Sequence, residues 1–329
     1  HYHRWQEDVE IIKNLGVDAY RFSFSWTRLF PTDGGAWNEK GFAFYDRLID
    51  ALLENKIQPW ATMFHWDLPQ YLQDKGGWTD RATVDRFVDF SAAVTERIKD
   101  RVRYIMLINE PSVVSVHGYA NGCHAPGLRD REKWLASTHH LNLGIGRGFR
   151  RLKALDPNLT IGSTYTVAPI RAATLDENGM KGRDLIDAAW NRNYFDPLLK
   201  GTYPKEFADA MKPYIKQGDM EECHTPIDFV GLQHYAPSYA ELAPDDKIIG
   251  ARNAAAPEHF KQTDIGWMIE PAGFTELLTA FKHTYGDVPL YITENGACFN
   301  DGLSDDGKVH DSRRVAFLQD YIQAMMAAK

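Results

Sequence analysis

Short apolar runs alternate with amphipathic stretches along the whole of this chain of 329 residues. Six of the runs are rich in β-branched or aromatic residues and end in polar turns, so the pattern predicts strands over residues 18–24, 57–64, 104–108, 159–165, 227–232 and 289–293. Their nearly continuous apolar character is typical of strands that are buried on both faces of a parallel sheet. Apolar residues at helical spacing predict amphipathic helices between and around these strands, among them residues 4–15, 40–55 and 311–328.

This alternation of strands and helices is typical of either a doubly wound sheet or a (β/α) barrel. Polar residues follow most of the predicted strands, and in a barrel the carboxyl ends of all strands meet at one mouth. A doubly wound sheet would concentrate them at one crevice instead. We therefore favour an α/β fold of the (β/α)8 TIM-barrel type, with residues 1–329 forming one domain without a visible linker.

The number of predicted strands is smaller than the eight that a closed barrel needs. The helix predicted over residues 4–15 has no strand before it, and the helix over residues 311–328 has no strand after it. The missing pair would be strands 1 and 8, which are neighbours in a closed barrel, so we expect a single gap at this seam. Because the chain begins at His1 rather than at Met, we also expect the natural N-terminus to lie upstream.

Two glutamates stand at the ends of predicted strands. Glu110, in an Asn-Glu-Pro tripeptide, follows the strand 104–108, and Glu294, in a Glu-Asn-Gly tripeptide, follows the strand 289–293. Enzymes that cleave a glycosidic bond typically use two carboxyl groups that face one cleft. A single carboxylate in such a place often caps the next helix or pairs with an arginine, but two in matching positions favour a catalytic pair.

Several polar and aromatic residues near the strand ends could serve the same cleft. Asn109 offers an amide that could hold a sugar hydroxyl, and Arg21 could keep a neighbouring carboxylate ionised. His65 and Trp66 could bind sugar hydroxyls and cover an apolar sugar face, and Trp267, in a predicted loop, could stack on a substrate. The structural alternatives are an ordinary ion pair for Arg21 and a buried aromatic beside a hydrogen-bonded histidine for His65 and Trp66.

Composition excludes several other classes of protein. The chain is 44% hydrophobic and 25% charged, with a net charge of −8 and no basic face, so nucleic acid is not an expected partner. No apolar stretch is long enough to span a membrane, and the absence of a visible signal peptide makes a cytoplasmic location the expectation. Three cysteines, Cys123, Cys223 and Cys298, are too scattered for a disulfide framework. The oligomeric state is not indicated by the sequence.

Metal and cofactor signals are weak. The pairs His1-x-His3 and His139-His140 could bind a metal, but no convergent third ligand is visible in the sequence. The glycine-rich stretch 144–148 lacks the spacing of a dinucleotide fingerprint and does not follow a strand, so it is better explained as a close-packed or loosened helix turn. We expect neither a metal nor an organic cofactor.

Short motifs occur along the chain in a specific order: His1-Tyr2-His3-Arg4-Trp5, Ala19-Tyr20-Arg21-Phe22-Ser23, His65-Trp66-Asp67-Leu68-Pro69, Asn109-Glu110-Pro111, His124-Ala125-Pro126-Gly127 and Thr293-Glu294-Asn295-Gly296. Together they resemble glycoside hydrolase family 1, the β-glucosidase family. The resemblance extends over essentially the whole chain, and the ordered set is highly specific.

The resemblance implies a single catalytic (β/α)8 barrel and a retaining mechanism without a cofactor. Glu110 would be the general acid/base and Glu294 the nucleophile. The resemblance also implies that Asn109 contacts the sugar 2-hydroxyl and that His65 and Trp66 bind the glycone hydroxyls. It implies that Arg21 and Tyr235 orient the nucleophile. Trp267 would form part of the leaving-group platform.

The sequence also departs from the family. Gln233-His234-Tyr235 stands where Asn-Tyr-Tyr is common, so the role of Tyr235 transfers more safely than that of Gln233. Ser112 replaces a tryptophan that often follows Asn-Glu-Pro, which removes a stacking surface for the leaving group. Met268 and Glu270 alter the segment around Trp267. The first strand of the family supplies a glutamine to the glycone and the eighth supplies a glutamate and a tryptophan, and this chain has neither segment.

From the resemblance we expect a retaining β-glycosidase, and most specifically a β-glucosidase that hydrolyses terminal β-D-glucosyl residues of small glucosides or cello-oligosaccharides. The alternatives are a catalytically impaired sugar-binding fragment and a transglycosylase of the same fold. The choice among glucose, galactose, fucose and a 6-phospho sugar depends largely on the missing eighth-strand segment.

Overall fold

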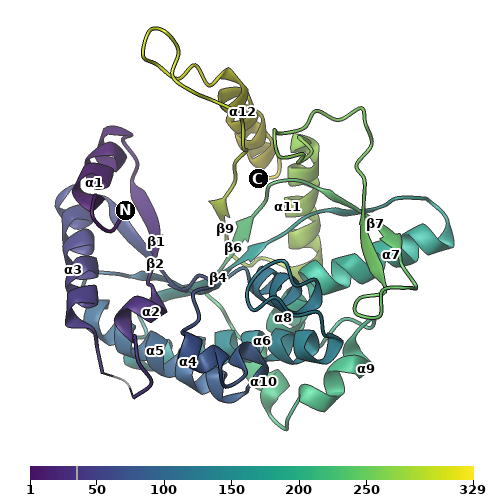
Figure 1. Cartoon of the computed structure of the whole chain (residues 1–329), viewed down its shortest axis with the longest axis horizontal. Helices are drawn as coiled ribbons and strands as arrows, with labels where there is room; N and C mark the ends of the chain where they lie inside the picture. Colours follow the sequence, from purple (N-terminus) through teal and green to yellow (C-terminus); the bar gives the residue numbers. More distant parts are fainter. Residues whose placement is uncertain (35) are drawn as a thin grey trace.

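A six-stranded parallel sheet forms the centre of the computed structural model, which describes residues 1–34 and 36–329 (Figure 1). Its strands, in spatial order, are β1 (Ala19–Ser23), β2 (Gln58–Phe64), β3 (Tyr104–Asn109), β4 (Thr160–Thr166), β6 (Phe229–Gln233) and β9 (Leu290–Glu294). All the strands predicted from the sequence are confirmed, and their observed ends differ from the predicted ones by no more than two residues.

The sheet is curled rather than open. Trp60 on β2 stacks on Tyr104 of β3 with ring centroids 4.1 Å apart, and it also meets Tyr291 of β9 at 4.9 Å. β2 and β9 are four strands apart in the sheet, which would separate them by roughly 19 Å if the sheet were flat. These rings meet only because the strands wrap around a common axis. The prediction of a (β/α) barrel arrangement over a doubly wound sheet is therefore confirmed.

The curled sheet has two ends, β1 and β9, and no strand pairing joins them within the described residues. Figure 1 shows the two strands at opposite ends of the curl. Every residue of β6 is buried, whereas no residue of β9 is, and Tyr291 keeps 40% of its surface exposed. The strand count thus agrees with the sequence, and both end strands keep one edge of the backbone without a strand partner.

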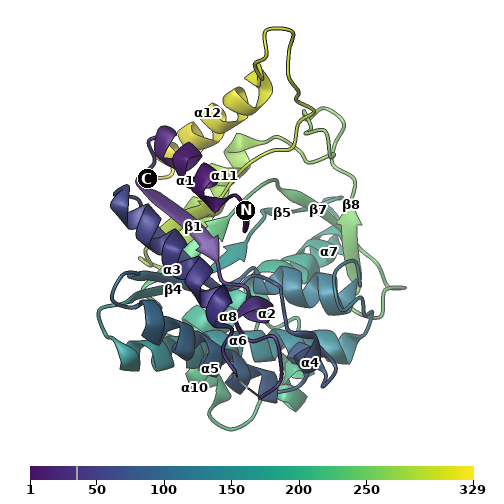
Figure 2. The ribbon, with the colours of Figure 1, turned by 60° about the vertical axis from the view of Figure 1, so that its left-hand side comes forward.

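Helices surround the sheet, as Figures 1 and 2 show from two sides. The helices expected over residues 4–15, 40–55 and 311–328 are confirmed as α1 (Trp5–Asn14), α3 (Glu39–Glu54) and α12 (Ser312–Ala327). The others are α2 (Trp26–Leu29), α4 (Gln70–Gln73), α5 (Ala82–Ile98), α6 (Arg131–Leu155), α7 (Glu177–Asp187), α8 (Asn193–Lys200), α9 (Ala208–Met211), α10 (Asp219–Cys223) and α11 (Pro271–Tyr285).

Other helical segments of the described residues are not α-helical: the 3₁₀ turns η1 (Gly77–Thr79) and η4 (Lys212–Tyr214) and the π-helices η2 (Val113–Ala120) and η3 (Ala188–Arg192). Within the described residues, no helix is both long enough and apolar enough to cross a membrane.

A second, three-stranded sheet was not predicted from the sequence. It consists of β5 (Ile170–Ala172), β7 (Ser238–Leu242) and β8 (Ala251–Ala254), with β5 and β7 parallel and β7 and β8 antiparallel. These strands are short and only partly buried, so they lack the continuous apolar runs that identify the barrel strands. Because β5 follows β4 and β7 follows β6, this small sheet stands beside the carboxyl ends of the barrel strands.

The glycine-rich stretch 144–148 lies inside α6, as close packing predicts. A Cβ atom on Gly146 would approach the carbonyl oxygen of Glu222 on α10 to 1.9 Å, and one on Gly148 would approach the Leu107 side chain of β3 to 3.0 Å. These glycines allow α6 to lie directly against its neighbours and are not part of a phosphate-binding loop.

Candidate active site

The two predicted glutamates line one cavity of about 670 Å³. Glu110 follows β3 directly, and Glu294 is the last residue of β9, so both carboxyl groups lie at the carboxyl ends of parallel strands. His65, Trp66, Tyr235 and Trp267 line the same cavity. The structure therefore brings together residues that the sequence separates by most of the chain.

Three side chains donate hydrogen bonds to the Glu294 carboxylate. Arg21 Nη1 donates to Oε1 at 2.6 Å, Gln233 Nε2 donates to the same oxygen at 2.7 Å, and the Tyr235 hydroxyl donates to Oε2. An ionised carboxylate accepts hydrogen bonds and donates none, so this set of donors matches the charged form. Burial, followed by the bond to Glu294, raises the pKa of Tyr235, which therefore keeps its proton and remains a donor.

Asn109 connects the strand ends around the site. Its Oδ1 atom accepts hydrogen bonds from Arg21, from Gln233 at 2.9 Å and from Thr164 at 2.9 Å. Three donors on one oxygen fix the orientation of the amide, so Nδ2 is the atom that faces His65 Nε2 at 3.1 Å. The amide nitrogen then donates to His65, whose own proton lies on Nδ1.

His65 and Trp66 are held against the same asparagine. The Trp66 indole N–H donates to the backbone carbonyl of Asn109 at 3.0 Å. Burial and the nearby charge of Arg21 lower the pKa of His65, which keeps its imidazole neutral. Trp66 has a positive φ of 80°, a conformation that residues other than glycine seldom adopt. Backbone strain of this kind clusters at functional sites.

Glu110 also has a positive φ, of 48°, and its backbone N–H donates to the carbonyl of Thr164 at 2.8 Å. The residue is only 5% exposed. Burial, and in second place the negative charge of Glu294, raises the pKa of Glu110 to about 8. At neutral pH Glu110 is accordingly protonated, while the donors around Glu294 suit an ionised carboxylate. Two carboxyl groups in opposite protonation states can act as an acid and a nucleophile.

Trp267 lies at the edge of the site. Its ring centroid is 5.2 Å from that of Tyr235, and its backbone N–H donates to Thr263 Oγ1 at 3.1 Å. The indole is 42% exposed while lining the cavity, which is a suitable position for contact with a ligand. Glu270, one of the residues near Trp267 that differ from the family, forms an ion pair with Arg171 at 3.0 Å, so its carboxylate already has a partner within the protein.

Sequence reasoning underestimated one residue and missed others. The sequence favours Tyr235 over Gln233, yet the Gln233 amide bridges Asn109 and Glu294 and is fully buried. Its position at the end of β6 was a usable signal. His117 and Trp190 also line the cavity, but each lies in a π-helix that no local pattern predicted.

Three of the four histidines that suggested a metal have hydrogen-bonding partners in the protein. His139 contacts Asp219 and Tyr203, each at 2.9 Å, and His140 contacts the carbonyl of Trp78 at 2.9 Å. His1 contacts Asp8 at 2.6 Å. Among the residues that the structure describes, no group of three or more histidine, cysteine, aspartate or glutamate side chains could hold a metal ion.

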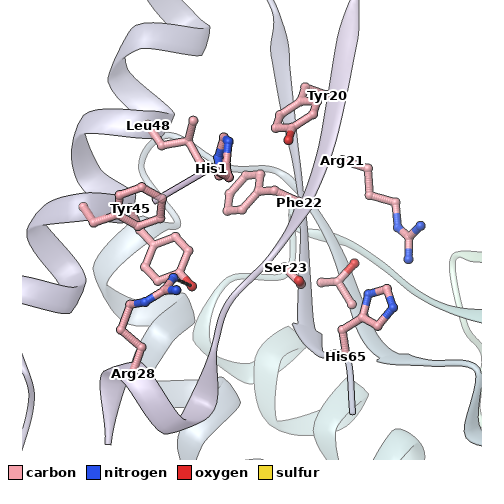
Figure 3. Close-up of a pocket in the computed structure, with 11 residues that line it drawn as sticks. His1, Tyr20, Arg21, Phe22, Ser23, Arg28, Tyr45, Leu48 and His65 are labelled. Atoms are coloured by element: carbon pink, nitrogen blue, oxygen red, sulfur yellow. Dashed lines mark hydrogen bonds between the residues drawn. The ribbon is translucent and has the colours of Figure 1, made fainter. Parts of the chain in front are cut away.

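A second cavity, of about 340 Å³, adjoins the site between β1 and α3 (Figure 3). Arg21, Ser23 and His65 lie toward one side of it, and Tyr45 and Leu48 toward the other. His65 lines both cavities, so the second one lies next to the cavity that holds Glu110 and Glu294.

Comparisons with known proteins agree with this geometry. The sequence model described as glycosyl hydrolase family 1 matches residues 1–329. Beta-glucosidase A of Acetivibrio thermocellus is 37% identical over 330 residues, which cover 98% of this chain and 73% of that protein. The structure of the psychrophilic beta-glucosidase BglU from Micrococcus antarcticus matches with a TM-score of 0.94 and 36% identity, covering 100% of this chain and 75% of that one. The structure of a beta-glucosidase from Thermotoga maritima in complex with deoxynojirimycin matches with a TM-score of 0.92 and 36% identity, covering 100% of this chain and 74% of that one.

The raised pKa of Glu110 can be measured directly. In protein with ¹³C-labelled glutamate, we expect the Glu110 carboxyl signal, assigned by its loss in Glu110→Gln, to titrate with a midpoint near pH 8. Glu294→Gln removes a neighbouring negative charge and should lower that midpoint, because ionising Glu110 then meets less repulsion. The control Glu276→Gln, on an exposed side chain of α11, should leave it unchanged. A midpoint near the ordinary value of 4.5, or one that Glu294→Gln does not move, would contradict the assignment.

Proposed function

This chain belongs to glycosyl hydrolase family 1 and is a glycoside hydrolase, and on that basis we propose that it is a retaining β-glucosidase. Its substrates are small β-glucosides or cello-oligosaccharides, from which it removes the terminal β-D-glucosyl residue. The relatives named as beta-glucosidases support the choice of glucose as the glycone. Residues 1–329 belong to one catalytic domain.

In the first step Glu294 attacks the anomeric carbon and forms a covalent glycosyl–enzyme. The bond from that carbon to the leaving oxygen breaks, and Glu110 transfers its proton to the oxygen. Arg21, Gln233 and Tyr235 hold the Glu294 carboxylate in position for this attack. The observation that carries the proposal is the buried Glu110, whose surroundings raise its pKa to about 8, in the same cavity as this donor-bound carboxylate.

In the second step water replaces the leaving group. Glu110, now ionised, removes a proton from the water as its oxygen attacks the anomeric carbon, and the bond to Glu294 breaks. Once Glu294 is esterified its negative charge is gone, which lowers the pKa of Glu110 and makes it a competent base. The same residue can therefore serve as acid and then as base.

The glycone is held by groups that the strand ends place beside the two carboxyls. Asn109 contacts the sugar 2-hydroxyl, and His65 and Trp66 bind other glycone hydroxyls. The fixed orientation of the Asn109 amide supports this role, because a donor that is already oriented loses little freedom on binding. Trp267 forms part of the platform for the leaving group.

Replacement of Glu294 tests the nucleophile. We expect Glu294→Ala to lower kcat by several orders of magnitude, and a 2-fluoro glucoside with a good leaving group to label Glu294 in the unaltered protein, as mass spectrometry of the digested protein would show. The exposed Glu54, on α3, provides the control, since Glu54→Ala should keep full activity. Labelling of a different carboxylate would refute the assignment.

Replacement of Glu110 tests the acid/base by its dependence on the leaving group. Glu110→Gln should lower kcat/KM for methyl β-glucoside by roughly 100- to 10,000-fold, because the poor leaving group needs a proton. For 2,4-dinitrophenyl β-glucoside, whose leaving group needs little protonation, kcat/KM should change far less. Equal losses for both substrates would count against the role.

We further propose that two more strands complete the barrel at the seam between β1 and β9. The free strand edges, the exposed face of β9 and the cavity beside β1 support this proposal. The greater length of the relatives supports it as well, since this chain covers 73% of one and 75% of another. The added strands would satisfy the open backbone groups and supply the missing wall of the glycone pocket.

The seam proposal predicts that residues 1–329 expressed alone are poorly soluble or nearly inactive, because two open edges favour aggregation. Adding a strand before His1 and a strand and helix after Lys329, taken from a relative, should restore monomeric solubility and turnover. Light scattering and hydrolysis of an aryl β-glucoside measure the two effects. Full and stable activity of the unextended 329 residues would contradict the proposal.

A further inference from the structure

A row of aromatic rings leads away from the catalytic carboxyls along one wall of the large cavity. The Trp66 ring centroid is 5.5 Å from that of His124, His124 is 5.0 Å from His117, and His117 is 5.2 Å from Trp190. All of these side chains line the cavity. Because Trp66 also bonds to Asn109, the row begins at the site of bond cleavage and extends beyond it.

Two π-helices supply the outer part of this wall. His117 comes from η2, which starts three residues after Glu110, and Trp190 comes from η3. The hydroxyls of Ser115 and Tyr194 hydrogen-bond to each other and so connect η2 to the helix that follows η3. π-Helices are rare and frequently occur at functional sites, and here both of them present an aromatic ring to one cavity.

Part of the remaining wall of this outer part is aliphatic, and Ser238, Asp246, Arg252 and Asn253 add polar side chains to it. Ile170 of β5, Ile186 of α7, and Ile249 and Ala251 at β8 line the same cavity and belong to one small apolar cluster. These side chains offer no hydrogen bonds to a ligand. Ile170 and Ala251 belong to the second sheet, Ile186 to the helix packed on it and Ile249 to the segment before β8, so this sheet and its surroundings form part of the cavity wall.

Several polar side chains in this outer part already form hydrogen bonds or ion pairs within the protein. Asn121 Nδ2 lies 2.9 Å from His117 Nδ1, and its Oδ1 accepts from the backbone of Cys123 at 3.2 Å. Arg252 pairs with Glu241 at 2.7 Å. Burial lowers the pKa of His117, so its ring is neutral. A second sugar would need partners for several hydroxyls, whereas an aromatic ring would need only apolar and aromatic faces.

We propose that His117 and Trp190 determine leaving-group specificity, and that this outer part selects a planar, apolar aglycone over a second glucose. The inference rests on the proposed β-glucosidase function and narrows its substrate class to aryl and arylalkyl β-glucosides. Ser112, which stands where the family often has a tryptophan, is buried and does not line the cavity. The indole of Trp190 supplies the stacking surface from another element.

Two unactivated substrates separate aglycone binding from chemistry. In the active form of the protein, benzyl β-glucoside should have a kcat/KM at least about tenfold above that of methyl β-glucoside, and above that of cellobiose, because the phenyl ring enters the aromatic wall. Trp190→Ala should lower kcat/KM for the benzyl substrate roughly tenfold and change the methyl value less than about threefold. His117→Ala should act in the same direction, and Trp190→Phe should restore most of the benzyl preference.

Trp37→Ala, which removes an exposed indole outside this cavity, is the matched control and should leave the benzyl-to-methyl ratio unchanged. The inference would be overturned if all three substrates are hydrolysed and Trp190→Ala does not change the benzyl-to-methyl ratio, or if the protein prefers cellobiose. Either result would leave the β-glucosidase proposal intact. If the protein with the added strands and no point substitution hydrolyses no β-glucoside, that result would instead refute the proposed function on which the inference rests.

Discussion

The contact between Arg21 and Glu294 connects the first and last strands of the sheet. β1 and β9 are five strands apart, a separation of roughly 24 Å in a flat sheet, yet Arg21 Nη1 lies 2.6 Å from Glu294 Oε1. The contact therefore requires the curl of the barrel. It gives the Glu294 carboxylate a fixed cation at the mouth, and the same guanidinium reaches Asn109 on β3. The position of the Glu294 carboxylate and the shape of the sheet depend on each other.

The second constraint is the low polarity around Glu110. A buried carboxyl beside a negative charge keeps its proton at neutral pH, whereas Glu294 is surrounded by donors. The two groups have the same chemistry and differ only in their surroundings. In the proposed mechanism, this difference makes Glu110 the acid and Glu294 the nucleophile, and the pKa of Glu110 falls once Glu294 carries the sugar.

The sequence predicted the features that local patterns encode. Continuous apolar runs identified the six barrel strands, and the polar residues after them located both carboxyls, Arg21, His65 and Asn109. The second sheet was missed because β5, β7 and β8 are short and partly polar. The roles of Gln233, His117 and Trp190 depend on contacts between residues far apart in the chain, such as the bridge from Gln233 to Asn109. The local periodicity of the sequence does not indicate such long-range contacts.

The stereochemistry of the first-formed product tests the central claim most directly. Proton NMR of the reaction, recorded before the sugar mutarotates, reports the anomer released from a β-glucoside. Retaining glycosidases hold their two carboxyls about 5–5.5 Å apart, which leaves no room for an intervening water. With Glu294 as the nucleophile, we therefore expect the first product to be the β-anomer, with configuration retained. Initial release of the α-anomer would mean that water attacks directly, which would contradict Glu294 as a nucleophile.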